Sequence, residues 1–241
     1  MLSSFSAPVR ACVFGASGGI GAAFVHELAS DPLISVIHAG ARSKVAVSEK
    51  VRPFTFDLTD EQSIADAAVT VGAVDLVIIS TGLLHDTSLQ PEKSWRAQSA
   101  EAYAKIFAIN ATGPALIGKH FLSLLPRDRR SVFAAISARV GSISDNRLGG
   151  WHAYRASKAA LNMILRNFAV ELGRSHPQAV VAALHPGTVD TGLSEPFQRN
   201  VAADKLFAPE YSAQNLLKVI DGLTTEQSGK LFAWDGAEIP F

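Results

Sequence analysis

Short apolar runs alternate along this chain with segments in which apolar residues recur every three or four positions. The runs contain little polar alternation, as in parallel strands that are buried on both faces. The segments between them have the period of helices with one face in a core. This alternation predicts an α/β fold in a single domain, residues 1–241: a doubly wound, seven-stranded and mainly parallel sheet with helices on both faces. The expected strands are residues 9–14, 34–39, 51–56, 74–79, 131–137, 179–184 and 230–234.

The helical segments differ in length and spacing. We expect helices that begin near Ile20 and Asp60, a long one over residues 99–125, another from about residue 151 to 175, and a last one over residues 209–223. The second and third strands lie close together in the chain, which predicts a short or irregular connection. Residues 192–208 mix residue types without a clear period, so we expect a lid over a substrate pocket there.

The composition fits this fold and excludes several classes of partner. Hydrophobic residues make up 48% of the chain and charged residues 18%, which is ample for a sizeable core. The formal net charge is zero, which gives no reason to expect a nucleic acid or a membrane surface as a partner. A single cysteine, Cys12, excludes an internal disulfide and a cysteine metal cluster, and we expect no metal. Without a signal peptide or an apolar stretch of membrane-spanning length, the sequence predicts a cytoplasmic protein.

A glycine-rich turn follows the first predicted strand and precedes the first helix. Its glycines stand at positions 15, 19 and 21. A strand, a glycine turn and a helix N-terminus together form a cradle for phosphate, because free N–H groups and the helix dipole face the anion. The alternative is a glycine-rich loop that caps an ordinary helix. We favour a dinucleotide site, with contacts from Gly15, Ser17, Gly18, Gly19, Ile20 and Gly21.

The end of the second strand indicates which dinucleotide binds. An acidic residue there would hydrogen-bond the ribose hydroxyls of NAD, whereas an arginine would pair with the 2′-phosphate of NADP. No acidic residue occurs between Ile37 and Val47. The same stretch contains Arg42 and Ser43. We therefore expect NADP(H), with NAD(H) as the other possibility. The competing interpretation is that Arg42 is only a solvated loop residue.

Tyr154 and Lys158 stand four residues apart at the start of a predicted helix, so their side chains lie on one face. A phenol has an unperturbed pKa of about 10, and a nearby ammonium group would lower that pKa toward the range of a general acid or base. Taken alone, such a pair is more often a solvated helix face. Other polar positions therefore have to decide the matter.

Three further segments carry polar or small residues at unusual places. Ser80, Thr81 and Gly82 end the fourth strand, where small side chains let the backbone approach a flat ligand. Asn110 interrupts the apolar face of the long helix, and a buried amide there most often bonds to backbone or water. The segment from His185 to Thr191 follows the sixth strand and contains Pro186 and Gly187.

In their order and spacing these motifs resemble the short-chain dehydrogenase/reductase family, most closely a bacterial branch named after the C-factor protein. The resemblance covers the whole chain and implies a Rossmann-type fold. It implies adenine contacts from Asp57 and Leu58, a cofactor loop at residues 80–82 and a proton-relay water near Asn110. It also implies that Tyr154 and Lys158 are the catalytic pair and contact the cofactor. The nicotinamide contacts that it implies are Pro186, Gly187, Val189 and Thr191.

The serine that completes this family's site is displaced in the present sequence. Members usually carry it three residues before the glycine that is Gly141 here, and that position is Ala138. Ser137 is the nearest hydroxyl, although neighbouring strand residues point to opposite faces. Ser142 is the alternative, twelve residues before Tyr154. We choose Ser137 as the catalytic serine and leave Ser142 open.

The resemblance implies an NADP(H)-dependent oxidoreductase that moves hydride between nicotinamide and a small carbonyl or alcohol substrate. One alternative is an NADP(H)-binding signalling or regulatory protein with secondary or no catalysis. Another is an interaction protein that keeps the fold without a nucleotide, against which the glycine turn argues. Surplus apolar positions on the helices that carry Asn110 and Tyr154 predict a homodimer or homotetramer. Candidate residues of the substrate pocket are Leu83, Arg139, Trp151, His152, Leu193 and Phe197.

Overall fold

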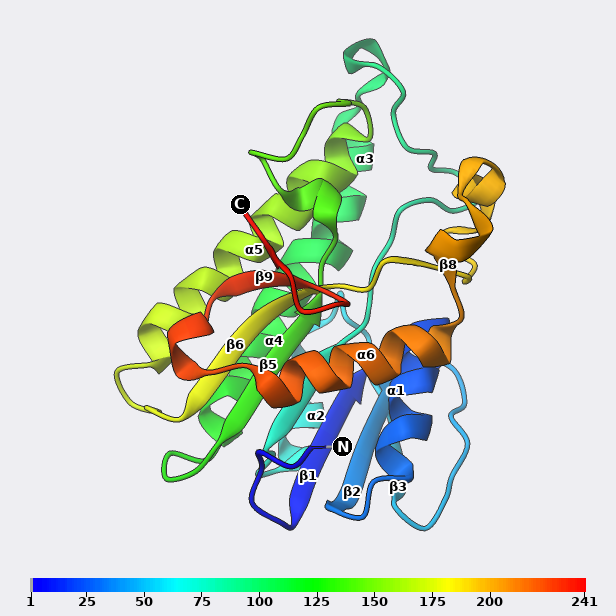
Figure 1. Cartoon of the computed structure of the whole chain (residues 1–241). Coiled ribbons are helices and arrows are strands. Elements are labelled where there is room, and N and C mark those ends of the chain that lie inside the picture. Colours follow the sequence, from blue (N-terminus) through cyan, green and yellow to red (C-terminus); the bar gives the residue numbers. More distant parts are fainter. Residues whose placement is uncertain (1) are drawn as a thin grey trace.

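The computed structural model describes residues 2–241 as a central sheet with helices on both faces (Figure 1). The strands lie in the order β10-β9-β6-β5-β4-β1-β2-β3. All neighbours run parallel except β10, which is antiparallel to β9. The order reverses at β1 and β4, which creates a crevice at the carboxyl ends of the strands. The strands are β1 (Val9–Phe14), β2 (Ile34–Ala41), β3 (Val51–Thr55), β4 (Leu76–Ile79), β5 (Ser131–Ile136), β6 (Ala179–His185), β9 (Lys230–Ala233) and β10 (Glu238–Ile239).

The doubly wound fold is confirmed, but the predicted count of seven strands is wrong. The main sheet has eight strands, because the chain turns back after β9 at Gly236, where φ is +86°, and adds the two-residue β10. Two further short strands, β7 (Thr188–Val189) and β8 (Leu206–Phe207), pair with each other apart from the main sheet. Strands of two residues leave no apolar run for a sequence pattern to detect.

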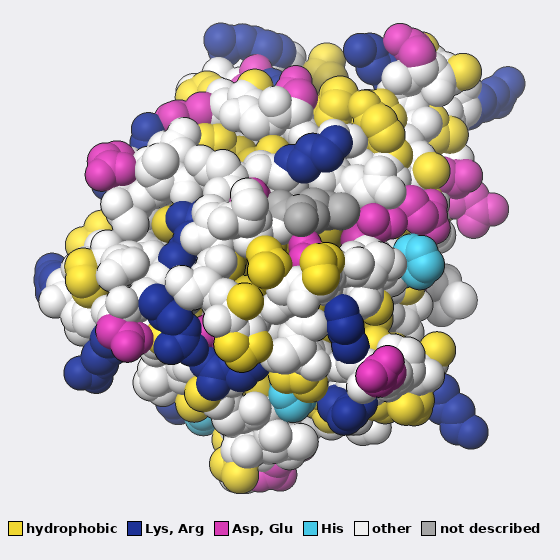
Figure 2. Space-filling model, turned by 60° about the horizontal axis from the view of Figure 1, so that its bottom comes forward, with side chains coloured by type: hydrophobic (Ala, Val, Ile, Leu, Met, Phe, Trp, Pro, Cys, Tyr) yellow, Lys and Arg dark blue, Asp and Glu magenta, His cyan; other side chains and the backbone are white. Residues whose placement is uncertain are grey.

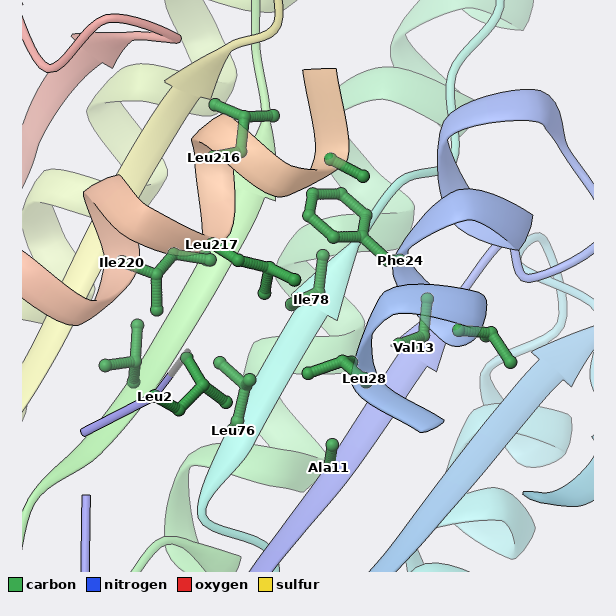
Figure 3. Close-up of a cluster of buried hydrophobic side chains, with 14 of the residues drawn as sticks. Leu2, Ala11, Val13, Phe24, Leu28, Leu76, Ile78, Leu216, Leu217 and Ile220 are labelled. Carbon is green, nitrogen blue, oxygen red and sulfur yellow. The ribbon is translucent and has the colours of Figure 1, made fainter. Parts of the chain in front are cut away.

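Each face of the sheet packs against its own set of helices. On one face lie α1 (Gly19–Ala29) and α6 (Pro209–Gly222), whose side chains meet those of β1 and β4 (Figure 3). The other face is covered by α2 (Glu61–Val71), α4 (Gly113–Phe121) and α5 (His152–Leu172). No helix in residues 2–241 is long and apolar enough to cross a bilayer. The connection between β2 and β3 contains no helix, as predicted.

The long helix predicted over residues 99–125 is interrupted. Ser99 caps α3 (Ala100–Phe107) by accepting a hydrogen bond from the Ala102 amide at 3.1 Å. A π-helical turn, η2 (Ala108–Thr112), then separates α3 from α4 and contains Asn110. Pro114 has no N–H and cannot make the α-helical bond to the Asn110 carbonyl. Single π-helical turns that interrupt an α-helix often occur at functional sites.

Charges are mixed on the face in Figure 2, which turns the bottom of Figure 1 toward the viewer. Basic and acidic side chains lie interspersed there with hydrophobic ones. This face carries no large patch of one sign, in keeping with the formal net charge of zero.

Candidate functional site

A cavity of about 610 Å³ opens at the carboxyl edge of the parallel strands. Ligands of open α/β sheets bind at this edge, where the strand order reverses. Five segments form its wall: the glycine turn after β1, the segment after β4, the end of β5 with the residues that follow, the first turns of α5, and the segment after β6. The predicted site residues in that wall are Gly18, Gly19, Ile20, Gly21, Ser80, Thr81, Gly82, Ser137, Tyr154, Lys158, Pro186, Gly187, Val189 and Thr191.

The glycine turn leaves its backbone uncovered at the start of α1. Gly15 has φ of +81°, and a Cβ there would lie 3.0 Å from Ser80 Oγ. A Cβ on Gly21 would lie 2.1 Å from the Gly15 carbonyl oxygen, so a larger residue would displace the turn. Ser17 and Gly18 are exposed, and α1 has no acidic residue in its first turn and no side-chain cap. Its first N–H groups and dipole are therefore free to bind an anion.

The segment after β4 links this turn to the helices of the opposite face. Ser80 Oγ donates to the Phe14 carbonyl at 2.8 Å. Thr81 Oγ1 is buried and has no hydrogen-bond partner among residues 2–241. A Cβ on Gly82 would lie 3.8 Å from both Asn110 Oδ1 and Lys158 Nζ. This segment therefore brings the predicted cofactor loop against the predicted catalytic residues and leaves a polar atom for a ligand.

The residues predicted to hold adenosine lie outside the cavity. Arg42 and Ser43 are exposed just beyond β2, and Asp57 is exposed beyond β3. Hydrogen bonds from the Thr59 amide and hydroxyl lower the pKa of Asp57, and the Arg42 charge lowers it further. Leu58 is buried against Gly113 of α4. The four residues thus form a separate group at the same edge of the sheet.

Glu92 fixes the start of the helix that carries Tyr154. Gly149, Gly150 and Trp151 all have positive φ, so the chain enters α5 by a left-handed turn. The Glu92 carbonyl accepts a hydrogen bond from the Trp151 amide at 2.6 Å, and its buried carboxylate accepts from the Ala153 amide at 3.3 Å. A carboxylate at a helix N-terminus is stabilised by the helix dipole. The sequence gives no sign of this contact, because Glu92 lies far from α5 in the chain.

Tyr154 and Lys158 are both buried one turn apart on α5. Lys158 Nζ donates to the Ile136 carbonyl at 2.8 Å and lies 5.9 Å from the centroid of the Tyr154 ring. Burial raises the pKa of Tyr154 to about 12 and lowers the pKa of Lys158 to about 8. The expectation that Tyr154 has a lowered pKa is wrong for this arrangement, because burial removes the solvation that a charged phenolate needs.

Ser137 lines the cavity, whereas Ser142 does not. Ser137 Oγ donates to Asn162 Oδ1 at 2.7 Å, and both side chains are buried. Ser142 Oγ instead donates to the Pro240 carbonyl and accepts from the Asp145 amide at 3.1 Å. Ala138, which occupies the position of the family's serine, also lines the cavity.

Asn110 is fully buried beside the cavity but does not line it. Its Oδ1 accepts from the Leu83 amide at 2.7 Å, and its Nδ2 donates to the Leu83 carbonyl at 2.8 Å and to Ser157 Oγ at 3.1 Å. Both amide hydrogens are thus used within the protein. The side chain clamps the segment after β4 to α5.

The wall after β6 contains Gly187, with φ of +79°, packed against Phe207 of β8. Thr191 faces the glycine turn, since a Cβ on Gly19 would lie 2.6 Å from its Cγ2. His185 lines the same wall and was missed as a site residue. His185 directly precedes Pro186 at the end of a predicted strand, and this position could have indicated that His185 lies at the site.

Four of the six expected substrate residues line the cavity: Arg139, Trp151, Leu193 and Phe197. The expectation is wrong for the other two. Leu83 is held by Asn110, and His152 borders a smaller hollow on the other side of α5's first turn. Leu84, Val140, Thr188, Ser194 and Val201 line the cavity without having been predicted.

The segment at residues 192–208 covers one side of the cavity. It forms short turns, η5 (Glu195–Asn200) and η6 (Ala203–Lys205), before β8. The Phe197 ring lies 5.0 Å from the Trp151 ring and 5.5 Å from the His85 ring, centroid to centroid. His85 Nε2 lies 3.1 Å from the carbonyl oxygens of Gly192 and Leu193.

Known proteins resemble this chain in sequence over most of its length. A family model described as short chain dehydrogenase matches residues 10–202. The C-signal protein of Myxococcus xanthus is 35% identical over 177 residues, which cover 72% of this chain and 96% of the relative. An uncharacterized oxidoreductase of Schizosaccharomyces pombe is 29% identical over 95% of this chain and 96% of its own.

Solved structures share the fold over nearly the whole chain. The NADPH-bound carbonyl reductase from chicken fatty liver has a TM-score of 0.84 at 24% identity and covers 99% of this chain and 96% of its own. The carbonyl reductase Sniffer of D. melanogaster has a TM-score of 0.83 at 19% identity and covers 98% of this chain and 100% of its own. At these identities the likeness concerns the fold.

Proposed function

Because this chain belongs to the short-chain dehydrogenase family, we propose that it is an NADP(H)-dependent carbonyl reductase with Tyr154 as the proton donor. One observation carries the proposal. A single cavity at the carboxyl edge of the sheet is lined by Tyr154, Lys158 and Ser137, and by the glycine turn and the Pro186–Gly187 segment. A proton donor and a phosphate cradle thus border one apolar space.

The residues present fit a dinucleotide. The exposed backbone at Gly18 and Gly19 suits the pyrophosphate, and the unpartnered Thr81 Oγ1 offers a polar contact. Arg42 and Ser43 would hold a 2′-phosphate beside Asp57 and Leu58 at the adenine, and the reduced nicotinamide, when bound, supplies the hydride. The chicken carbonyl reductase, which has the same fold, is NADPH-bound. The remaining contacts would come from Gly15, Ser17, Ile20, Gly21, Ser80, Gly82, Lys158, Pro186, Gly187, Val189 and Thr191.

Tyr154 acts as a general acid in the reductive direction. Because burial raises its pKa to about 12, the phenol keeps its proton at neutral pH and can donate it to the oxygen of a carbonyl that gains hydride. The ammonium group of Lys158 stabilises the phenolate that is left. Ser137 donates its proton to Asn162, so Ser137 Oγ is placed to accept a hydrogen bond from the hydroxyl of the alcohol product and not to donate one to the carbonyl.

Asn110 would resupply the proton through a water held by its backbone carbonyl. Both hydrogens of its side-chain amide already bond within the protein, so the amide is not a free donor. Pro114 cannot bond that carbonyl in the α-helical pattern, which supports the carbonyl as the site of the water. Segment 192–208 would close as a lid over the substrate.

A small-molecule carbonyl or alcohol is the proposed partner, with no nucleic acid or membrane, and we propose a homodimer or homotetramer in the cytoplasm. Met163 and Val170 support this assembly because they are exposed on α5, at 61% and 47%. Sedimentation equilibrium tests it: a monomer at micromolar concentration would count against it.

The test of the proposed activity is NADPH oxidation over a panel of aldehydes, ketones and quinones, with NADH in parallel. We expect turnover with at least one class and a preference for NADPH. Arg42→Ala should reduce that preference roughly 10-fold, the cost of one charge-assisted contact to phosphate. Arg174→Ala, an exposed arginine beyond α5, is the matched control and should leave the preference unchanged. Equal rates with NADPH and NADH would contradict the cofactor assignment.

A signalling or regulatory role is the second candidate, favoured by the likeness to the C-signal protein over 72% of this chain. Such a protein would bind NADPH without reducing any carbonyl. A fluorescence titration that shows NADPH binding, together with no turnover over the panel, would favour this role. A chain that binds no nucleotide would contradict both candidates.

A further inference from the structure

The hydroxyl proton of Ser137 points away from any substrate. A serine hydroxyl has one hydrogen, and here Ser137 Oγ donates it to Asn162 Oδ1 at 2.7 Å. Asn162 lies one turn beyond Lys158 on α5, is buried, and directs its Nδ2 at the Gly141 carbonyl at 3.5 Å. Its oxygen is therefore held toward the serine. A carbonyl oxygen in the cavity would face an acceptor at Ser137 and would need its second hydrogen bond from another residue.

His185 is the neighbour of Ser137 on the next strand. Ile136 pairs with Leu184, and the Ser137 amide donates to the Leu184 carbonyl at 2.8 Å. Ser137 and His185 each stand two residues beyond an alanine, Ala135 and Ala183, that packs in the core under α5. Alternation along the strands therefore puts both side chains on the face of the sheet that carries Tyr154. Both residues line the cavity.

The ring of His185 has a nitrogen free for a ligand. Nδ1 is enclosed and has no hydrogen-bond partner among residues 2–241, and Nε2 has no partner there either. Because an enclosed N–H without an acceptor costs free energy, the proton of the neutral ring belongs on Nε2. Burial lowers the pKa of His185 to about 4, with a further lowering from Arg139 and an opposing effect of Asp235, so the ring is neutral at pH 7.

We propose that His185 donates a hydrogen bond from Nε2–H to the carbonyl oxygen of the substrate, alongside Tyr154. As hydride adds to the carbonyl carbon, the carbon–oxygen π electrons move to the oxygen, which takes its proton from the Tyr154 hydroxyl. The His185 proton stays on Nε2, and its role is to stabilise the negative charge that develops. A neutral imidazole suits this task, because it donates a hydrogen bond without giving up its proton. The inference rests on the proposed carbonyl reduction.

Two variants of similar size separate this role from packing. His185→Gln keeps an N–H donor at the ε position, whereas His185→Met fills the space without one. We expect His185→Met to lower kcat roughly 100-fold, the usual effect of removing one such donor, with NADPH affinity measured by fluorescence unchanged. His185→Gln should recover most of that loss. Ser137→Ala should lower kcat less than His185→Met does, because the Ser137 proton is already bound by Asn162.

A second readout does not depend on turnover. Nitrogen-15 NMR of labelled histidine, assigned by comparison with His185→Gln, should show a neutral ring with its proton on Nε2 and no titration between about pH 5.5 and pH 8. A ring protonated on Nδ1, or one that titrates near its ordinary pKa, would overturn the proposal. So would a His185→Met enzyme with near wild-type kcat, or equal losses in the Gln and Met variants. If the wild-type chain reduces no carbonyl at all, the proposed function fails and this inference fails with it.

Discussion

Tyr154 and Lys158 have pKa values shifted in opposite directions by the same cause. Both side chains are buried, and burial disfavours whichever form carries charge. The pKa of the phenol rises to about 12, and the pKa of the ammonium group falls to about 8. At neutral pH the tyrosine keeps its proton and most of the lysine keeps its charge. This state suits proton donation to a carbonyl, whereas alcohol oxidation would require a phenolate that is scarce.

The lysine should therefore set an alkaline limit to reduction. A lowered pKa means that Lys158 loses its charge, and with it the stabilisation of the phenolate, as pH rises through about 8. We expect kcat/KM for NADPH-dependent reduction to be level below that pH and to fall above it, since this ratio reports groups of the free enzyme. Lys158→Met should be slow throughout and lack the inflection. A wild-type profile that stays level to about pH 10 would contradict this assignment.

At the scale of elements, the hydrophobic patterns in the sequence predict most strands correctly, and also the helix that carries Tyr154. They did not reveal the break at η2, because Asn110 and Pro114 lie within an apolar pattern that continues on both sides. The choice between Ser137 and Ser142 also lay beyond the sequence. Ser142 is bound by the Pro240 carbonyl, 98 residues away, and no local spacing reports such a contact. Leu83 and His152 were misplaced for a similar reason, since a shift of one residue turns a side chain to another wall.

Limited proteolysis tests the proposal that residues 192–208 close as a lid. Arg199 and Lys205 are exposed within residues 192–208 and provide sites for trypsin. Since Phe197 packs on Trp151 at the cavity wall, a bound carbonyl and NADPH should hold the segment closed and slow cleavage there. Cleavage at Arg147, an exposed residue of the loop before α5, is the internal control and should keep its rate. Identical cleavage of the lid with and without ligands would count against closure.

At the scale of the whole molecule, the two edges of the sheet have different tasks. The carboxyl edge gathers the site from segments far apart in the chain, and the predicted family membership is confirmed by the match over residues 10–202. The opposite edge holds Asp75, a buried carboxylate bonded by Arg10 at 2.8 Å and Arg129 at 2.7 Å. Sequence patterns locate the first edge through its glycines and polar residues. They miss the second, because Asp75 and its partners come from three separate segments.

The Asp75 cluster should stabilise the fold in a pH-dependent way. Burial alone would raise the pKa of Asp75, but hydrogen bonds from Arg10 and Arg129 outweigh it and lower the pKa. The stabilisation is then complete above the unfolded value of about 3.9 and is lost as pH falls through the lower folded value. We expect Asp75→Asn to reduce the free energy of unfolding by about 2 kcal/mol at pH 7.

Urea unfolding of both proteins across the acid range measures this effect. The difference between wild type and Asp75→Asn should be constant from about pH 5 to pH 8 and shrink below about pH 4. Asp128→Asn is the matched control, because Asp128 also pairs with Arg129, at 3.7 Å, but is 82% exposed. Asp128→Asn should reduce the free energy of unfolding by less than about 0.5 kcal/mol. If the difference in unfolding free energy between wild type and Asp75→Asn grows toward acid pH, the pKa of Asp75 is not lowered in the folded protein.

The measurement that bears most directly on function is the Tyr154→Phe substitution, which removes a single oxygen from the cavity wall. If Tyr154 donates the proton, kcat for NADPH-dependent carbonyl reduction should fall roughly 1,000-fold, within the usual range for a lost general acid. NADPH affinity, measured by fluorescence titration, should be unchanged, because the glycine turn and Lys158 remain in place. A variant that binds NADPH and keeps most of the wild-type rate would show that Tyr154 is not the acid.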